Sequence, residues 1–100
     1  MKLQMHSIHF DADRKLLDFV QKKADKLEKY FDKIIDGEVY LKLSKNGNNE
    51  NKVVELKINI PGNSLFAKEQ DRTFEAATES VVEALRRQLK KHKEKQYESL

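Results

Sequence analysis

LRRQLKKHKEK, residues 85–95, is the stretch from which the rest of the chain can be placed. It holds six arginines and lysines and one histidine in eleven residues. At 100° per residue, Leu85 and Leu89 fall on one side of a helix, and the cationic side chains flank them on both sides. Such a helix needs two environments at once: a core that buries the leucines, and a surface that presents the positive charge.

The composition fits one small folded domain. A chain of 100 residues typically forms a single domain and buries roughly 60–65% of its unfolded surface. Charged residues make up 37% of the sequence, but 38% hydrophobic residues argue against disorder. The net charge of +3 is too small to indicate nucleic-acid binding by itself, so the distribution of the charges matters more.

Several classes of protein are disfavoured by what the sequence lacks. It has no cysteine, which removes disulfides and thiolate metal sites. No apolar run approaches the ~20 residues of a membrane span, and residues 1–6 lack the apolar core of a signal peptide. We therefore expect a cytoplasmic protein without a membrane partner.

The N-terminal third predicts a strand followed by a helix. Over residues 2–10, the apolar positions change from odd to even numbers after Ser7, so the end of this strand is expected to bend or bulge. Asp13 is the expected N-cap of a helix over residues 14 to about 31. The Asp36-Gly37 pair is expected to close the connection to the next strand. The apolar stripe of the helix is Leu16, Val20, Ala24, Leu27 and Phe31.

The remainder predicts three strands and a second helix. Residues 38–45 and 53–60 alternate between apolar and polar side chains. The polar segment 46–51 between them contains an Asn-Gly pair and predicts a hairpin loop. A second turn at residues 61–63 leads to a third strand over residues 64–70. Asp71 or Thr73 is the expected N-cap of a last helix that runs to about Tyr97.

This order predicts an α+β fold of the form β-α-β-β-β-α. Each strand of the meander has one apolar face, so both helices should cover the same face of one four-stranded mixed sheet. The first strand, its helix and the second strand form a crossover unit. Such a unit is expected to be right-handed and to place its two strands parallel.

The basic cluster in the last helix has two explanations. Acidic residues precede it, and an acidic start with a basic end complements the helix dipole by about 0.3–1 kcal/mol per charge. However, the dipole effect fades within the final turn, whereas this cluster spans almost three turns. Like charges at positions 86 and 90, and at 87 and 91, also repel each other. The pattern therefore favours an anion-binding surface over a solvated helix face.

Lysines of the first helix are expected to add a second basic ridge if both helices pack on one face of the sheet. Aromatic residues suited to base stacking are sparse, with Tyr30 and Tyr40 the expected exposed ones, so recognition should rest on shape and the phosphate backbone. The candidate RNA-binding residues are Lys22, Lys23, Lys26, Lys29, Arg86, Arg87, Lys90, Lys91, His92, Lys93 and Lys95.

Catalytic and metal chemistry finds little support in the sequence. His6 and His9 have opposite strand parity, so a shared metal ion is not expected. No activated nucleophile, phosphate-binding glycine loop or carboxylate pair is evident. We expect a protein that is not an enzyme and that needs no cofactor.

Two segments resemble a known family. Residues 23–34, KADKLEKYFDKI, and residues 85–95 are similar to the ends of the two helices in the ribosome hibernation-promoting factors, a family that includes ribosome-associated inhibitor A and was once named for sigma-54 modulation. The resemblance implies a fold akin to double-stranded RNA-binding domains. It also implies a bacterial, ribosome-associated protein that binds small-subunit ribosomal RNA in the decoding region. There it would block the messenger and transfer RNA sites under stress or in stationary phase.

The resemblance also implies which basic residues contact RNA. These are Lys23, Lys26, Arg87, Lys91, Lys93 and, less closely matched, Lys95, whereas Arg86 and Lys90 rest on charge geometry alone. Two departures from the family pattern concern the start of the last helix, where only Ala77 is kept from Asp-Met-Tyr-x-Ala-Ile-Asp, and the first strand, where His6-Ser7 replaces a glycine-arginine pair.

Residues 1–100 are expected to be a single ribosome-binding domain of the short form, without the C-terminal dimerisation domain of the long form. We expect a monomer off the ribosome, and the resemblance implies, in some bacteria, a separate ribosome-dimerising factor. Two alternatives stay open on the sequence alone. One is a general duplex-RNA-binding protein, and the other is a protein-interaction module.

Overall fold

The elements follow the order that the sequence predicts. A computed structural model describes residues 1–45 and 49–98, with side chains as far as residue 95. The elements are β1 (Leu3–Ile8), α1 (Arg14–Tyr30), β2 (Asp36–Leu43), β3 (Lys52–Ile60), β4 (Asn63–Asp71) and α2 (Phe74–Glu98). The tip of the predicted Asn-Gly turn, residues 46–48, lies outside the described residues.

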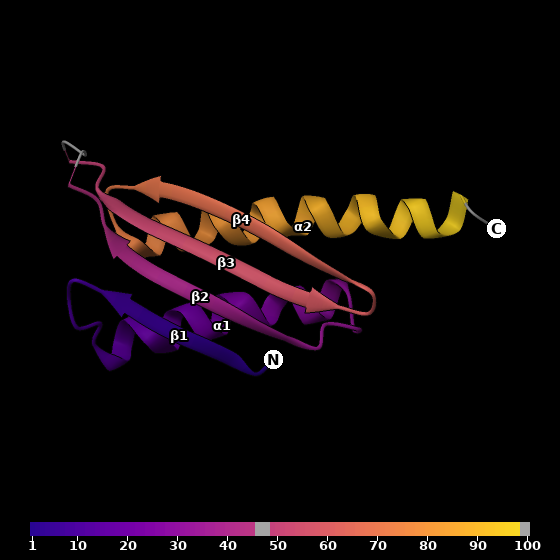
Figure 1. The fold of residues 1–100 in the computed structure, drawn as a ribbon, viewed down its shortest axis with the longest axis horizontal. Coiled ribbons are helices and arrows are strands. Elements are labelled where there is room, and N and C mark those ends of the chain that lie inside the picture. The colour runs from indigo at the N-terminus through magenta and orange to yellow at the C-terminus, as the bar shows by residue number, and fades with distance from the viewer. Residues whose placement is uncertain (46–48, 99–100) are drawn as a thin grey trace.

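The four strands form one mixed sheet in the order β1-β2-β3-β4. β1 pairs with β2 in parallel, and the two later pairings are antiparallel. Figure 1 shows both helices behind the sheet, α1 along β1 and β2 and α2 along β3 and β4. The predicted α+β fold, with both helices on one face, is confirmed.

The first strand is shorter than predicted because the chain bends at His9. This residue has a φ of 69°, a left-handed conformation that ends the extended backbone. The bend turns Phe10 back to the helical side of the sheet, where its ring stacks on Phe74 with the centroids 4.8 Å apart. The predicted bend is confirmed, and it follows Ser7, where the apolar positions change from odd to even numbers.

The prediction that Asp36-Gly37 closes a connection is wrong, because both residues are the first of β2. The Gly37 amide donates to the Lys2 carbonyl at 2.9 Å. A Cβ atom on Gly37 would lie 3.0 Å from Leu3 Cδ1 and 3.1 Å from the Lys57 carbonyl oxygen. The glycine is thus suited to close packing inside the sheet rather than to a turn. Gly62, with a φ of 76°, does serve a turn, between β3 and β4.

Side-chain caps begin both helices. The Asp13 carboxylate accepts from the Leu16 amide at 2.8 Å, as predicted. In α2 the cap is Thr73, whose hydroxyl oxygen accepts from the Ala76 amide at 3.0 Å. Of the two predicted alternatives, Asp71 instead ends β4.

The core lies between the sheet and the two helices. It contains the predicted stripe of α1 from Val20 onward and the even-numbered apolar residues of β3. Leu85 and Leu89 of α2 are both 0% exposed. At 1.5 Å per residue, the 25 residues of α2 span about 37 Å, and Figure 1 shows its C-terminal part continuing beyond the strands. Leu89 thus packs the C-terminal part of α2 against the core.

The Leu89→Ala variant tests this attachment. We expect the free energy of unfolding to fall by about 2–5 kcal/mol, because a fully buried leucine leaves a cavity when it is truncated. The measurement is urea unfolding followed by circular dichroism. The neighbouring Lys90→Ala, at an exposed position, should change stability by about 0.5 kcal/mol or less. Equal losses in the two variants would contradict this role of Leu89.

Candidate RNA-binding surface

Burial of Leu85 and Leu89 determines which side chains of α2 face outward. Both leucines are 0% exposed, so the opposite side of the helix must face solvent. Arg86, Arg87 and Lys90 are exposed there. Lys91 and Lys95 are exposed as well, whereas His92 and Lys93 are half-buried. The helix therefore presents its cations over almost three turns, as the sequence predicts.

The two helices lie side by side and run in the same direction. Lys23 Nζ of α1 is 3.3 Å from a Glu79 carboxylate oxygen of α2. Two turns further along α1, the Tyr30 ring lies 5.8 Å from the guanidinium carbon of Arg86 and 4.6 Å from Lys93 Nζ. On α2 these two residues lie about two and about four turns beyond Glu79. The expectation of two adjoining basic ridges is thus only partly met. Lys23 lies beside the acidic start of α2, and the residue of α1 that contacts the basic end of α2 is the aromatic Tyr30.

The end of α1 holds part of the basic cluster in place. Lys93 Nζ donates to the Tyr30 carbonyl oxygen at 3.2 Å. The His92 ring contacts Phe31 edge-on, with the centroids 5.6 Å apart. Lys93 and His92 therefore have structural partners in the free protein. The sequence predicts both as candidate RNA-binding residues, but it does not identify their partners on α1.

Other cations are compensated by carboxylates. Arg86 donates to both oxygens of Glu83, at 2.8 and 3.0 Å, and its guanidinium lowers the pKa of that carboxyl group. Arg87 lies 3.8 Å from Glu83 and remains 61% exposed. Among the side chains that the structure describes, no carboxylate pairs with a further six lysines. These lysines are all exposed: Lys22, Lys26, Lys29, Lys90, Lys91 and Lys95.

Lysines on α1 are close enough to affect one another. The neighbouring Lys23 amine lowers the pKa of Lys26 from the usual lysine range, and Lys22 adds further like charge. Glu79 opposes the shift but does not cancel it. Such uncompensated positive charge is stabilised when an anion approaches.

The cations of α2 point to two sides of the helix. Arg86 and Lys93 face α1 through Tyr30. Lys91 and Lys95 line a hollow with Asn63 and Leu65 at the start of β4. By helical geometry, Lys90 lies on the solvent side between these two groups. The positive surface therefore wraps the outer half of α2 rather than forming a single groove against α1.

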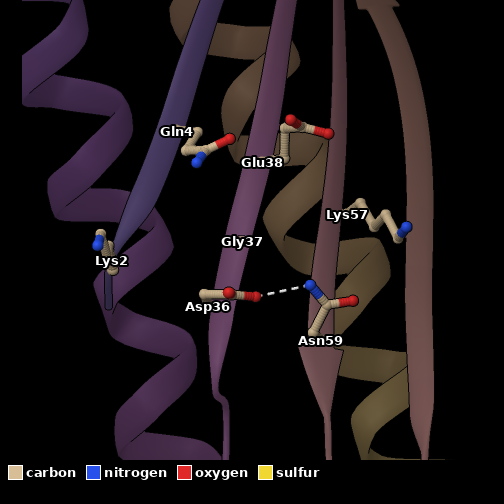
Figure 2. A pocket seen from close by; sticks show the side chains of 7 residues that line it. All are labelled: Lys2, Gln4, Asp36, Gly37, Glu38, Lys57 and Asn59. Atoms are coloured by element: carbon tan, nitrogen blue, oxygen red, sulfur yellow. Dashed lines mark hydrogen bonds between the residues drawn. The ribbon is translucent and has the colours of Figure 1, made fainter.

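The open face of the sheet has a different character. A hollow of about 200 Å³ lies there. Figure 2 shows the side chains around it, which come from Lys2 and from β1, β2 and β3. Two lysines and two acids line it together with two amides, and Asp36 accepts from Asn59 Nδ2 at 2.6 Å. Nearby, the His6 ring stacks on Tyr40 and its Nε2 lies 3.1 Å from a Glu38 oxygen. This mixed and internally paired charge does not suit a polyanion.

Two further features bear on the class of protein. Over the described residues, no three histidine, aspartate or glutamate side chains come together as a metal site would require. Neither helix, within the same residues, combines the length and apolar character needed to cross a membrane.

Comparison with known proteins identifies the family. Residues 3–97 match the family model described as sigma 54 modulation protein / S30EA ribosomal protein. The chain belongs to this family. A curated relative, the ribosome hibernation promoting factor of Pseudomonas putida, is 34% identical over 96 residues, which cover 96% of this chain and 90% of that protein.

Solved structures share the fold. A ribosomal subunit interface protein from Coxiella burnetii has a TM-score of 0.82 at 22% identity, covering 93% of this chain and 98% of that one. The N-terminal domain of Thermus thermophilus Protein Y has a TM-score of 0.79 at 24% identity, covering 92% and 99% of the two chains. The β-α-β-β-β-α arrangement seen here is thus the arrangement of those proteins.

The Lys93→Ala variant tests the division between structural and free cations. We expect it to lower the free energy of unfolding by about 1–2 kcal/mol, because it removes a hydrogen bond and a contact with an aromatic ring. Lys91→Ala, which removes the same charge from an exposed side chain, should change stability by about 0.5 kcal/mol or less. Chemical denaturation of both variants measures the difference, and equal stabilities would show that Lys93 is as free as Lys91.

The pKa of Lys26 tests the clustering on α1. Replacement Lys23→Met should raise the pKa of Lys26 toward the ordinary lysine value, because the like charge beside it is removed. The measurement is an NMR titration of the lysine side-chain signals. Lys29→Met is the matched control, since Lys23 is the main cause of the shift. If the pKa of Lys26 is unchanged in the Lys23→Met variant, the two amines are not close to each other in solution.

Proposed function

We propose that this protein is a ribosome-binding hibernation factor that inhibits translation by occupying the small subunit. Family membership and the hibernation factors among its relatives support the general activity. The finer proposal is contact with small-subunit ribosomal RNA in the decoding region, where the protein would block the messenger and transfer RNA sites. The role proposed for this chain is binding rather than catalysis.

One observation carries the proposal. Six exposed lysines on α1 and α2 have no carboxylate partner among the described side chains, and the exposed Arg87 adds to them. A protein does not need this repulsive arrangement for its own stability, but a phosphate backbone supplies the missing counter-charge. If about six phosphates are neutralised, affinity should fall about a thousandfold between 50 and 200 mM salt.

Three elements of the proposal concern assembly. The protein is proposed to act as a monomer off the ribosome. Where ribosomes are paired, a separate dimerising factor is proposed to supply that step. Binding is proposed to require intact ribosomal RNA, which distinguishes it from a protein-interaction module whose binding would survive nuclease treatment.

Charge reversal on the outer side of α2 tests the proposal. The double variant Arg87→Glu/Lys91→Glu should lose cosedimentation with ribosomes, because two attractive contacts become repulsive. Its melting temperature should stay within a few degrees, since exposed substitutions change stability by about 0.5 kcal/mol.

The matched control makes the same change of charge on the open face of the sheet. Lys57→Glu/Lys68→Glu, at two exposed positions, should keep ribosome binding. Equal loss in both double variants would mean that only the net charge matters. Full binding by the α2 variant would refute the assignment of this surface. Equal affinity of the wild-type protein for random RNA duplexes and for ribosomes would indicate a general duplex-RNA-binding protein.

A further inference from the structure

A hollow of about 240 Å³ lies between the start of β4 and the C-terminal part of α2. Its lining is Asn63, Leu65, Gln88, Lys91, His92 and Lys95. It opens on the side of α2 that faces β4, since Gln88 Nε2 donates to the carbonyl oxygen of Phe66 on that strand at 2.8 Å. Arg86 and Lys93, by contrast, lie against Tyr30 of α1. The hollow is therefore separate from the seam between the two helices.

The inner wall of the hollow suits a flat group. Leu65 is half-buried there and supplies an apolar surface. The imidazole of His92 is held edge-on by Phe31, with ring centroids 5.6 Å apart, so its orientation is fixed before any ligand arrives. Histidine rings are among the side chains on which unstacked RNA bases stack.

Two amide groups offer unused hydrogen-bonding atoms beside this wall. Gln88 Nε2 is engaged by Phe66, which fixes the amide and leaves its Oε1 as an acceptor. Asn63 Oδ1 accepts from the Ser64 amide at 2.8 Å, which leaves its Nδ2 as a donor. Within the described residues, neither Gln88 Oε1 nor Asn63 Nδ2 has a partner. A donor and an acceptor that line the same hollow suit the edge of a nucleobase, which presents both kinds of group.

The charge and the size of the hollow limit what it can bind. Lys91 and Lys95 are exposed and line the same hollow, without a carboxylate partner among the described side chains. Its 240 Å³ is below the roughly 300–1,000 Å³ of pockets that hold drug-sized ligands. A single planar group with an attached anion fits these properties better than a larger molecule or a stacked duplex.

We propose that this hollow binds one unstacked nucleotide of a single-stranded RNA segment. The base lies against Leu65 and His92, its edge bonds to Asn63 and Gln88, and Lys91 and Lys95 contact the phosphate. This inference rests on the proposed RNA-binding function. It adds a second kind of contact, because it recognises a base that a continuous duplex cannot offer.

The test compares two fluorescein-labelled RNA probes of equal length, a single-stranded oligouridine and a blunt duplex. The double variant Asn63→Ala/Gln88→Ala should bind the single strand about tenfold more weakly, as expected for two lost hydrogen bonds. Its affinity for the duplex should change less than about twofold, and the salt dependence should not change, because no charge is removed. Gln4→Ala removes an exposed amide from the open face of the sheet (Figure 2). It is the matched control and should behave like the wild type.

The outcomes separate this inference from the proposed function, which cosedimentation with ribosomes reports independently. Wild-type protein that cosediments with ribosomes but binds the single strand no better than the double variant overturns the nucleotide site alone. An equal loss for both probes also overturns it. Wild-type protein that fails to cosediment at low salt contradicts the proposed function itself. If the double variant unfolds, Asn63→Ala at its exposed position should still weaken single-strand binding about threefold, and no change there overturns the site.

Discussion

Repulsion between like charges along the last three turns of α2 is the constraint that the rest of the structure must satisfy. Like pairs four residues apart each destabilise a helix by about 0.2–0.5 kcal/mol. Burial of a leucine contributes about 1.5–3 kcal/mol, and both Leu85 and Leu89 are fully buried. Two buried leucines therefore outweigh several repulsive pairs. The sheet and α1 provide the core in which that burial is possible.

The end of α1 completes the arrangement by contacting the basic part of α2. Tyr30 contacts Arg86 and Lys93, and Phe31 contacts His92. These contacts fix three members of the cluster, while the exposed lysines beside them keep their charge unpaired. The basic surface thus consists of a held inner part and a free outer part. The free part holds the lysines that contact no carboxylate or aromatic ring among the described side chains, so it is the part most accessible to a phosphate backbone.

Local patterns predicted much of this fold. Alternation in β3 and the stripe of α1 identified their buried faces, because a strand and a helix repeat with fixed periods. The prediction of a turn at Asp36-Gly37 is wrong, because Gly37 is needed for close packing inside the sheet and not for a turn. Helical geometry also predicts that Arg86, Lys90 and Lys91 are exposed, but it does not predict the half-burial of Lys93.

Contacts between distant segments could not be read in the same way. The pairing of Lys23 with Glu79 and of Lys93 with Tyr30 depends on how two helices pack, which periodicity does not specify. The hollow beside β4 likewise joins Asn63 to Lys91 across separate elements. The residues that line this hollow come from two separate segments of the chain, so no sequence motif indicates it. Chemical acetylation of lysines in the free and the ribosome-bound protein, read by mass spectrometry, tests the central claim most directly. The account predicts that Lys26, Lys90 and Lys91 lose reactivity on binding while Lys57 and Lys68 keep theirs, and protection of the open sheet face with unchanged helices would contradict it.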